Sequence, residues 1–193
     1  MMSNPINKFK SCWDKAKSNS TLKHPSAVCI TTIDEHGFPC GRFVDLKAVD
    51  DIGFIFCTNL DSQKGRDIQR NPKVGLTFWW EAIGYQVRVN GIATQIPSSI
   101  SEKYWEMRSR DAQITTLSCK QSQPLLSEQD LNKQFEEAKR NIGEMQIPKP
   151  ENWGGFNVKP ESIEFLTFKE SRLHIRELYS AFGDVWNKSL LQP

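Results

Sequence analysis

Five β-strand candidates follow one another in the first half of the chain with a single helix between them, and this order restricts the fold most. The candidates are short runs rich in β-branched and aromatic residues, separated by turns. They cover residues 27–33, 39–49, 54–57, 74–80 and 85–96. A parallel sheet needs a crossover helix between most strands, and those helices are missing. The order therefore predicts an α+β protein whose antiparallel sheet closes into a barrel.

The second half of the chain is more helical. Ser98 or Ser99 can cap a helix that runs through Arg108, and residues 127–130 resemble a capping box that starts a polar helix ending near residue 141. Two further strands are expected at 155–158 and 162–168.

The N-terminal arm, residues 1–25, has a pattern of its own. Asn4 followed by proline is typical of a helix start, and apolar residues recur at helical spacing from Ile6 to Ala16 with lysines between them. We interpret the arm as an amphipathic helix packed on the body, with a lysine-rich cover over an anionic site as the alternative. Residues 26–193 are expected to form a single domain, as the chain length suggests.

Composition bounds the class of function. A net charge of +2 is too mild to indicate a nucleic-acid or membrane partner. No apolar run approaches the ~18 residues of a membrane span. Five cysteines without a C-x-x-C pair indicate reduced thiols in a cytoplasm, and neither a disulfide framework nor a metal site is expected.

Residues 53–71 carry the clearest indication of a binding site. An apolar strand leads through a polar loop into a helix that Ser62 can cap. Gln63 and Lys64 stand in its first turn, beside backbone N–H groups that a helix leaves free. These groups, the helix dipole and a cation together suit a phosphate. A solvated basic turn is the alternative.

Other polar side chains stand on or beside predicted elements. Arg42 and Lys47 are an odd number of residues apart on one strand, so they are expected on opposite faces. Gln86 interrupts an apolar strand and is expected to be a buried amide that needs a partner. Tyr104 and Arg108 are four apart on the expected helix and should share a face.

A third group stands near the C-terminus. Arg172, His174 and Arg176 have the period-two spacing of one strand face. Three cation-capable side chains on one face repel unless an anion lies among them. The spacing therefore favours a ligand site here.

Several motifs together resemble the pyridoxamine 5′-phosphate oxidase family. They occupy residues 41–47, 58–66, 86–87, 121–123, 153–156, 163–165 and 171–174, in an order that holds from about residue 27 to 193. The resemblance implies an antiparallel split β-barrel of the FMN-binding type with peripheral helices. It also implies a homodimer, with a C-terminal dimerisation region, that shares its FMN sites between subunits. The implied reaction oxidises pyridoxamine or pyridoxine 5′-phosphate to pyridoxal 5′-phosphate, with O₂ as acceptor and H₂O₂ as product.

The resemblance also implies roles for individual residues. The cofactor residues would be Arg42, Phe43, Val44, Lys47, Cys57, Thr58, Gln63, Lys64, Gln86, Gln121, Ser122 and Arg176. Of these, Arg42 and Lys64 would hold the FMN phosphate. The phosphorylated substrate would be held by Lys47, Tyr104 and Arg108. Arg172 and His174 would cover its ring and act as the catalytic residues.

The chain departs from the family pattern at several of these positions. Gln63 replaces an arginine, Cys57 a tyrosine, Ala112 a serine and Leu166 a tryptophan, and Asp45 puts an acid where the family is apolar. Flavin oxidases of phenazine biosynthesis also carry glutamine in the phosphate loop. Two alternatives therefore remain open: a related FMN oxidase with a non-B6 substrate such as a phenazine precursor, and a flavin-binding protein without turnover.

Overall fold

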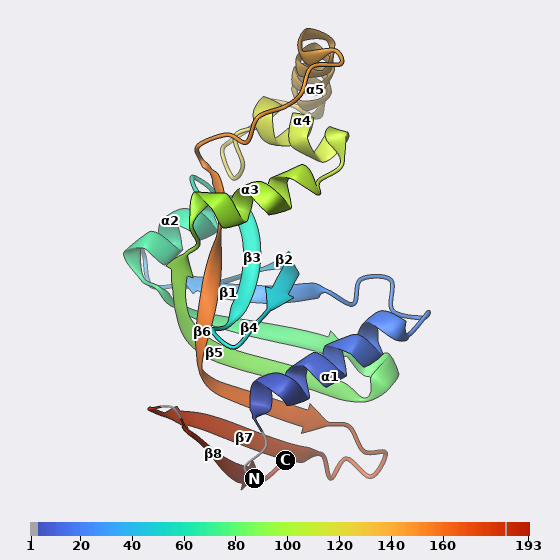
Figure 1. Ribbon diagram of the computed structural model, residues 1–193, viewed down its shortest axis with the longest axis vertical. Coiled ribbons are helices and arrows are strands. Elements are labelled where there is room, and N and C mark those ends of the chain that lie inside the picture. The colour runs from blue at the N-terminus through green and yellow to red at the C-terminus, as the bar shows by residue number, and fades with distance from the viewer. Residues whose placement is uncertain (1–3, 184) are drawn as a thin grey trace.

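An antiparallel barrel of six strands forms the centre of the protein (Figure 1). In this computed structural model, which describes residues 4–183 and 185–193, the strand order is β3-β2-β1-β4-β5-β6, and β3 also pairs with β6. The barrel strands are β1 (Ala27–Ile33), β2 (Pro39–Val49), β3 (Phe54–Asn59), β4 (Lys73–Trp80), β5 (Tyr85–Gln95) and β6 (Trp153–Thr167). All their pairings are antiparallel. The predicted antiparallel barrel is confirmed.

The first five strands lie within two residues of their predicted bounds because their apolar residues alternate. Val28 and Ile30 of β1 and Val87 and Val89 of β5 are fully buried in one core. Residues between them face outward, as period-two alternation requires. The local pattern therefore determines which side of each strand fills the barrel.

The two strands predicted at 155–158 and 162–168 form one continuous strand, β6, so that prediction is wrong. The residues between them stay paired with β5 through a register shift at Asn90 and Gly91. The first half of β6 closes the barrel against β3. Its second half pairs with β7 (Ile175–Phe182), which pairs with β8 (Val185–Leu191).

Helix α1 (Pro5–Ser18) packs against the barrel (Figure 1). The Asn4 side chain caps it by accepting the Ile6 N–H at 2.9 Å, as predicted. Phe9 is fully buried, with its ring centroid 4.8 Å from those of both Phe54 and Phe78. The described part of the arm is therefore an amphipathic helix packed on the barrel core.

The remaining helices include α2 (Gln63–Arg70) and the 3-10 helix η1 (Glu81–Ile83). Three more, α3 (Ser98–Glu106), α4 (Arg110–Ser118) and α5 (Glu128–Ile142), form a helical lobe at one end of the molecule (Figure 1). The Trp105 and Trp153 rings, 5.1 Å apart, join this lobe to β6. None of the described helices combines the length and apolar character needed to cross a membrane.

Two details of the lobe differ from the sequence predictions. Pro97 precedes α3 and no side chain caps that helix, so neither Ser98 nor Ser99 acts as expected. The helix ends at Glu106, because Ser109 caps a new helix, α4, by accepting the Ala112 N–H. In α5 the predicted cap is confirmed, since Ser127 accepts the Asp130 N–H at 3.1 Å.

Candidate functional site

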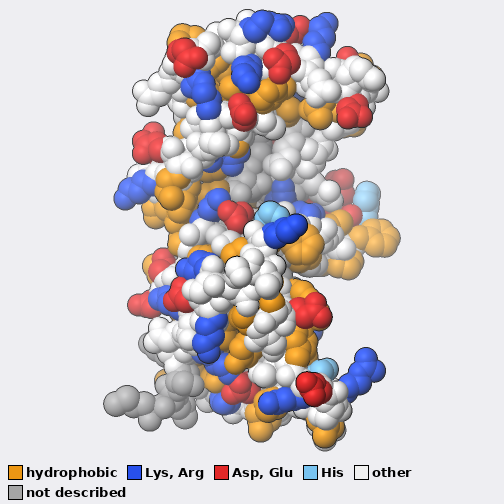
Figure 2. Space-filling view, turned by 90° about the vertical axis from the view of Figure 1, so that its right-hand side faces the viewer, with side chains coloured by type: hydrophobic (Ala, Val, Ile, Leu, Met, Phe, Trp, Pro, Cys, Tyr) orange, Lys and Arg blue, Asp and Glu red, His pale blue; other side chains and the backbone are white. Residues whose placement is uncertain are grey.

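A cavity of about 380 Å³ opens between β2, β3, the start of α2 and α4. Figure 2 views the molecule from the right-hand side of Figure 1 and shows a hollow, with Lys and Arg side chains in it, between the helices and the barrel. Eight predicted site residues line the cavity: Phe43, Val44, Lys47, Cys57, Thr58, Lys64, Arg108 and Gln121. Three of these residues are cations, namely Lys47, Lys64 and Arg108, and the lining contains one carboxylate, Asp45. The excess of positive charge suits an anionic ligand.

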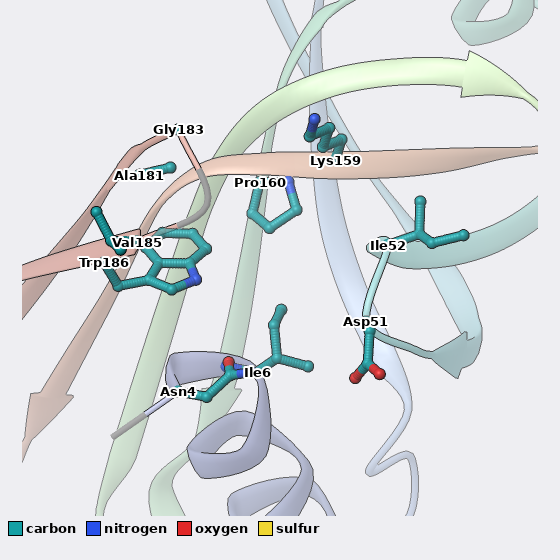
Figure 3. Close-up of a pocket in the computed structure, with 10 residues that line it drawn as sticks. All are labelled: Asn4, Ile6, Asp51, Ile52, Lys159, Pro160, Ala181, Gly183, Val185 and Trp186. Carbon is teal, nitrogen blue, oxygen red and sulfur yellow. The ribbon is translucent and has the colours of Figure 1, made fainter. Parts of the chain in front are cut away.

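A second cavity, of about 410 Å³, lies among the N-terminus of α1, the β2–β3 turn and the β7–β8 hairpin (Figure 3). Its lining combines apolar side chains, including Ile6, Ile52 and Trp186, with one acid, Asp51, and one lysine, Lys159. None of the predicted site residues is among them. The chemistry indicated by the sequence therefore belongs to the cavity beside α2.

The start of α2 holds a buried lysine. Ser62 caps this helix with its hydroxyl, and Lys64, which is 6% exposed, donates to the hydroxyls of Thr58 and Ser62 at 3.3 Å. Burial and the neighbouring charge of Arg42 lower the pKa of Lys64 to about 8, while Asp67 opposes the shift. A buried ammonium group beside a second cation gains from a bound anion. Anion binding at this helix start therefore stays a prediction, and the buried cation is the feature on which it depends.

Gly65 allows the loop before α2 to close on the helix. A Cβ atom at this position would lie 2.0 Å from the carbonyl oxygen of Leu60. Because the clash is with backbone, only glycine fits without moving the loop. This close contact keeps the hydroxyls of Thr58 and Ser62 next to the Lys64 ammonium group.

Arg42 lies behind this lysine and not in the cavity lining. Its guanidinium donates to Thr32 Oγ1 at 2.6 Å and is 3.6 Å from Asp67 Oδ2. Lys47 Nζ instead donates to Asp45 Oδ2 at 2.7 Å. The two cations thus lie on opposite faces of β2, as the odd spacing predicts.

Two of the three residues predicted to hold a substrate phosphate, Lys47 and Arg108, line the cavity with Cys57, and Tyr104 packs against the same hydrophobic cluster as Cys57. Burial raises the pKa of Cys57 to about 11, against the opposing charges of Lys47 and Arg108. Burial and the nearby Cys57 also raise the pKa of Tyr104. Tyr104 belongs to α3, whereas Arg108 follows the end of that helix, so the predicted shared helix face is wrong. Arg108 instead lies in the turn between α3 and α4.

Arg108 is held mainly by uncharged groups. It donates to the Ala112 carbonyl at 2.9 Å and to Thr116 Oγ1 at 3.1 Å, and it lies over the Trp153 ring, 5.2 Å from the centroid. Burial lowers its pKa, and its Nε atom is buried without a hydrogen-bond partner in the part of the chain described. Such a cation retains donor capacity for an anion.

Gln86 and Arg176 lie away from the cavity, in an outer-face patch that also contains Leu166. The register pairs Gln86 with Leu166 and Leu166 with Arg176. Gln86 is half-buried and on the outer face, because its neighbour Val87 fills the core. The expectation of an amide buried in an apolar strand is therefore corrected. Strands β2 and β5 are three spacings apart in the sheet, about 14 Å along its surface.

A buried carboxylate anchors this patch. Arg176 Nε donates to Glu164 Oε1 at 2.8 Å, and Arg88 donates to the other oxygen. Burial by itself raises the pKa of Glu164, but the hydrogen bonds and charges of Arg176 and Arg88 outweigh it and lower the pKa. The ion pair fixes the Arg176 side chain on the sheet surface.

Arg172 and His174 lie in the loop before β7, so the predicted three-residue strand face is wrong. Only Arg176 belongs to the strand, and Arg172 has a left-handed φ of 63°. His174 Nδ1 accepts the Lys169 N–H at 3.1 Å, and its ring packs edge-on against Phe168 at 5.7 Å. In the neutral ring the proton therefore resides on Nε2.

Of the three remaining predicted cofactor residues, Gln121 lines the cavity, and Gln63 and Ser122 do not. Gln63 Nε2 donates to Cys40 Sγ at 3.5 Å and does not line the cavity. Gln121 Oε1 accepts from Thr58 at 3.4 Å, and the adjacent Ser122 has a left-handed φ of 69°.

Part of the cavity lining was not predicted as a site. Helix α4 contributes Thr115 and Thr116, and Cys119 follows it directly. The sequence does contain a signal for this helix, since Ser109 is a capping residue and Asp111 stands in the first turn.

Comparisons with known proteins agree with this geometry. A family model described as pyridoxamine 5′-phosphate oxidase matches residues 15–147, and one described as the pyridoxine 5′-phosphate oxidase C-terminal dimerisation region matches residues 153–193. The pyridoxine/pyridoxamine 5′-phosphate oxidase of Vibrio cholerae serotype O1 is 37% identical over 193 residues, which cover 100% of this chain and 91% of the relative. That of Shewanella halifaxensis is 38% identical over 189 residues, which cover 98% and 89%.

Solved structures share the fold. PhzG from Burkholderia lata 383, in complex with tetrahydrophenazine-1-carboxylic acid, aligns with a TM-score of 0.91 and 27% identity, over 99% of this chain and 93% of that one. A pyridoxamine 5′-phosphate oxidase-related, FMN binding protein from Nostoc punctiforme aligns with a TM-score of 0.81 and 18% identity, over 100% of both chains.

The closed six-stranded barrel defines the fold class, the split barrel, which this chain shares with the Nostoc punctiforme protein. The family models and the full-length relatives identify the family within this fold class. The chain belongs to the pyridoxamine 5′-phosphate oxidase family and is an FMN-dependent oxidoreductase. The resemblance indicated by the sequence motifs is confirmed.

Proposed function

We propose that this protein oxidises pyridoxamine or pyridoxine 5′-phosphate to pyridoxal 5′-phosphate. For the alcohol, one O₂ is consumed and one H₂O₂ is formed; the amine also consumes water and releases ammonia. The observation that carries the proposal is that Lys47 and Arg108 line the same cavity as Lys64, so the cavity offers cations for a second anionic group. Tyr104 packs against the same hydrophobic cluster as Cys57, which also lines the cavity. Relatives named for this activity, at 37–40% identity, support the proposal.

The start of α2 fits the phosphate end of FMN. Lys64 is buried among neutral hydroxyls, has a lowered pKa and lies near Arg42, so a dianionic phosphate would offset both cations. In our proposal Lys64 contacts this phosphate, aided by the helix N-terminus, and Arg42 adds positive charge from its position beside Thr32 and Asp67. The bound flavin supplies the redox chemistry, and the protein supplies orientation and electrostatics.

The substrate phosphate occupies the second cationic group. Lys47 and Arg108 neutralise it, and the Tyr104 hydroxyl donates a hydrogen bond, because its raised pKa keeps it protonated at neutral pH. Binding at a fixed phosphate positions the substrate ring, and this is how such a site lowers the barrier to reaction.

A homodimer with shared sites accounts for the separation of the predicted residues. Gln86 and Arg176 lie on the outer-face patch, three strand spacings from β2, whereas Lys64 and Thr58 line the cavity. One chain therefore offers two halves of a site on different surfaces, and a second copy would bring them together. The match of residues 153–193 to a dimerisation region supports this assembly.

Backbone strain supports a role for Arg172 and Ser122. They are the two non-glycine residues with positive φ among residues 4–183 and 185–193. Such a conformation is unfavourable by roughly 1–3 kcal/mol and persists mainly where function or packing requires it. In our proposal Arg172 and His174 cover the substrate ring, with His174 Nε2–H directed to it.

A related oxidase with a non-B6 substrate is the second candidate. The Burkholderia lata protein, solved with a phenazine carboxylic acid, shares 27% identity and a TM-score of 0.91. Ala112, in the first turn of α4, also lacks the hydroxyl of the serine that the family usually carries at this position. Both observations favour a substrate whose anionic group is smaller than a phosphate.

A peroxide assay separates these functions. The purified protein is loaded with FMN and supplied with pyridoxine 5′-phosphate, and with unphosphorylated pyridoxine as the control. Peroxide release that requires the phosphate supports the B6 oxidase. A yellow protein that is inert to both, but consumes O₂ with a reduced phenazine carboxylate, supports the second candidate. Inertness to every substrate indicates a flavin-binding protein without turnover.

A further inference from the structure

The cavity contains one carboxylate among the residues described, and it is bonded to a cation of the proposed substrate site. Asp45 Oδ2 is 2.7 Å from Lys47 Nζ. The two residues are neighbours on one face of β2, two positions apart. The Lys47 side chain is 28% exposed and that of Asp45 61%, so the lysine is shielded more than the acid.

The other two cations of the cavity lining have no such partner. Lys64 donates to the hydroxyls of Thr58 and Ser62, and Arg108 donates to a carbonyl and a hydroxyl. Within the described lining, Lys47 is thus the cation whose charge is already paired. The ion pair therefore reduces the net positive charge at the proposed substrate position and leaves the charge at the proposed FMN phosphate position unchanged.

We propose that Asp45 is a specificity-determining residue that weakens binding of doubly charged phosphate esters relative to ligands without a phosphate. A dianion that reaches Lys47 must share it with a carboxylate of the same sign, and the repulsion grows with the charge of the ligand. A neutral ligand meets no such repulsion. Selectivity between ligands is set by unfavourable as well as favourable contacts. This inference rests on the proposed B6 function, because it takes Lys47 as a substrate-phosphate residue.

The test compares Asp45→Asn with the wild-type holoenzyme, because asparagine keeps the shape and removes the charge. The ligands are 4-deoxypyridoxine 5′-phosphate and 4-deoxypyridoxine, which lack the oxidisable group, and their affinities are measured by calorimetry. We expect Asp45→Asn to bind the phosphate ester about tenfold more tightly and the unphosphorylated ligand equally well. The gain should shrink at high salt, since the carboxylate is partly exposed. Asp51→Asn, which removes an exposed charge from the β2–β3 turn, should change neither affinity.

The outcomes separate this inference from the proposed function. The deciding quantity is the affinity for the phosphate ester divided by the affinity for the unphosphorylated ligand. The inference is overturned if this ratio is the same in Asp45→Asn and wild type, or if neither ligand binds. A higher ratio in Asp45→Asn than in wild type supports the inference. If wild-type protein releases no peroxide with pyridoxine 5′-phosphate but Asp45→Asn still changes the ratio, the proposed reaction is wrong and the role of Asp45 stands.

Discussion

Replacing Lys64 by methionine should stabilise the apoprotein and weaken FMN binding, two effects of opposite sign. Lys64 is buried, and its folded-state pKa of about 8 lies below the ordinary value of 10.5. The charged lysine is therefore unfavourable in the folded apoprotein at neutral pH, and methionine of similar length removes that charge. If Lys64 were a structural residue only, its removal would lower stability and leave FMN binding unchanged.

The magnitude follows from the pKa shift. A fall from 10.5 to about 8 corresponds to about 3 kcal/mol at the 1.36 kcal/mol that each pKa unit represents. Water reaches the ammonium group through the open cavity, and two hydrogen bonds to hydroxyls are lost, so we expect a net gain of about 1–2 kcal/mol. Loss of a charge-assisted bond to the FMN phosphate should weaken affinity by ~10- to 100-fold.

The sign of the pH dependence gives a second check. Because the folded-state pKa is lowered, the unfavourable term is fully present below about pH 8 and is relieved as the pH rises from 8 towards 10.5. The stability advantage of Lys64→Met over wild type should therefore shrink in that range. Wild-type FMN affinity should fall above about pH 8, where the free lysine loses its proton, and the variant should not show this fall.

Urea denaturation of the apoproteins at pH 7 and pH 9.5, and flavin fluorescence titrations at the same pH values, measure these effects. Arg70→Met removes an exposed cation from the last turn of the same helix and serves as the matched control. A Lys64→Met apoprotein that is less stable than wild type, or that binds FMN equally well, would refute the assignment of the phosphate to this helix start.

Four further predictions concern the other parts of the site. Ala112→Ser adds a hydroxyl beside Arg108 and should lower KM for pyridoxine 5′-phosphate severalfold without changing FMN affinity; an unaltered KM would favour the non-B6 substrate. Arg172→Ala and His174→Ala should reduce turnover with FMN still bound, and normal peroxide release by both would assign these residues to structure. Light scattering should show a dimer that holds two FMN molecules, whereas a monomer that retains FMN would exclude shared sites. Glu164→Gln should lower the urea midpoint near pH 7, and the difference should vanish as the pH falls through the lowered pKa of Glu164, because the ion pair is lost there; a difference that is constant with pH would contradict this.

Local features of the chain were sufficient to predict the barrel and the helix proposed to bind a phosphate. Apolar alternation assigns the faces of β1 and β5, and the scarcity of helices between strands requires antiparallel pairing. The cap at Ser62, which begins α2, also follows from neighbouring residues in the sequence. In each case the deciding interactions join residues a few positions apart, and periodicity and capping rules describe such interactions.

The tertiary structure alone decided which of the predicted residues meet. Arg108 lies in a turn and joins the cavity lining, because α3 ends at Glu106 and Ser109 begins a new helix where one continuous helix was expected. Gln86 faces outward and Arg176 is held by Glu164, so both lie on a surface other than the cavity. These arrangements depend on strand register and on contacts between residues far apart in the chain. A one-dimensional pattern assigns a side chain to a face of its own element, but only the packing of elements determines what that face meets.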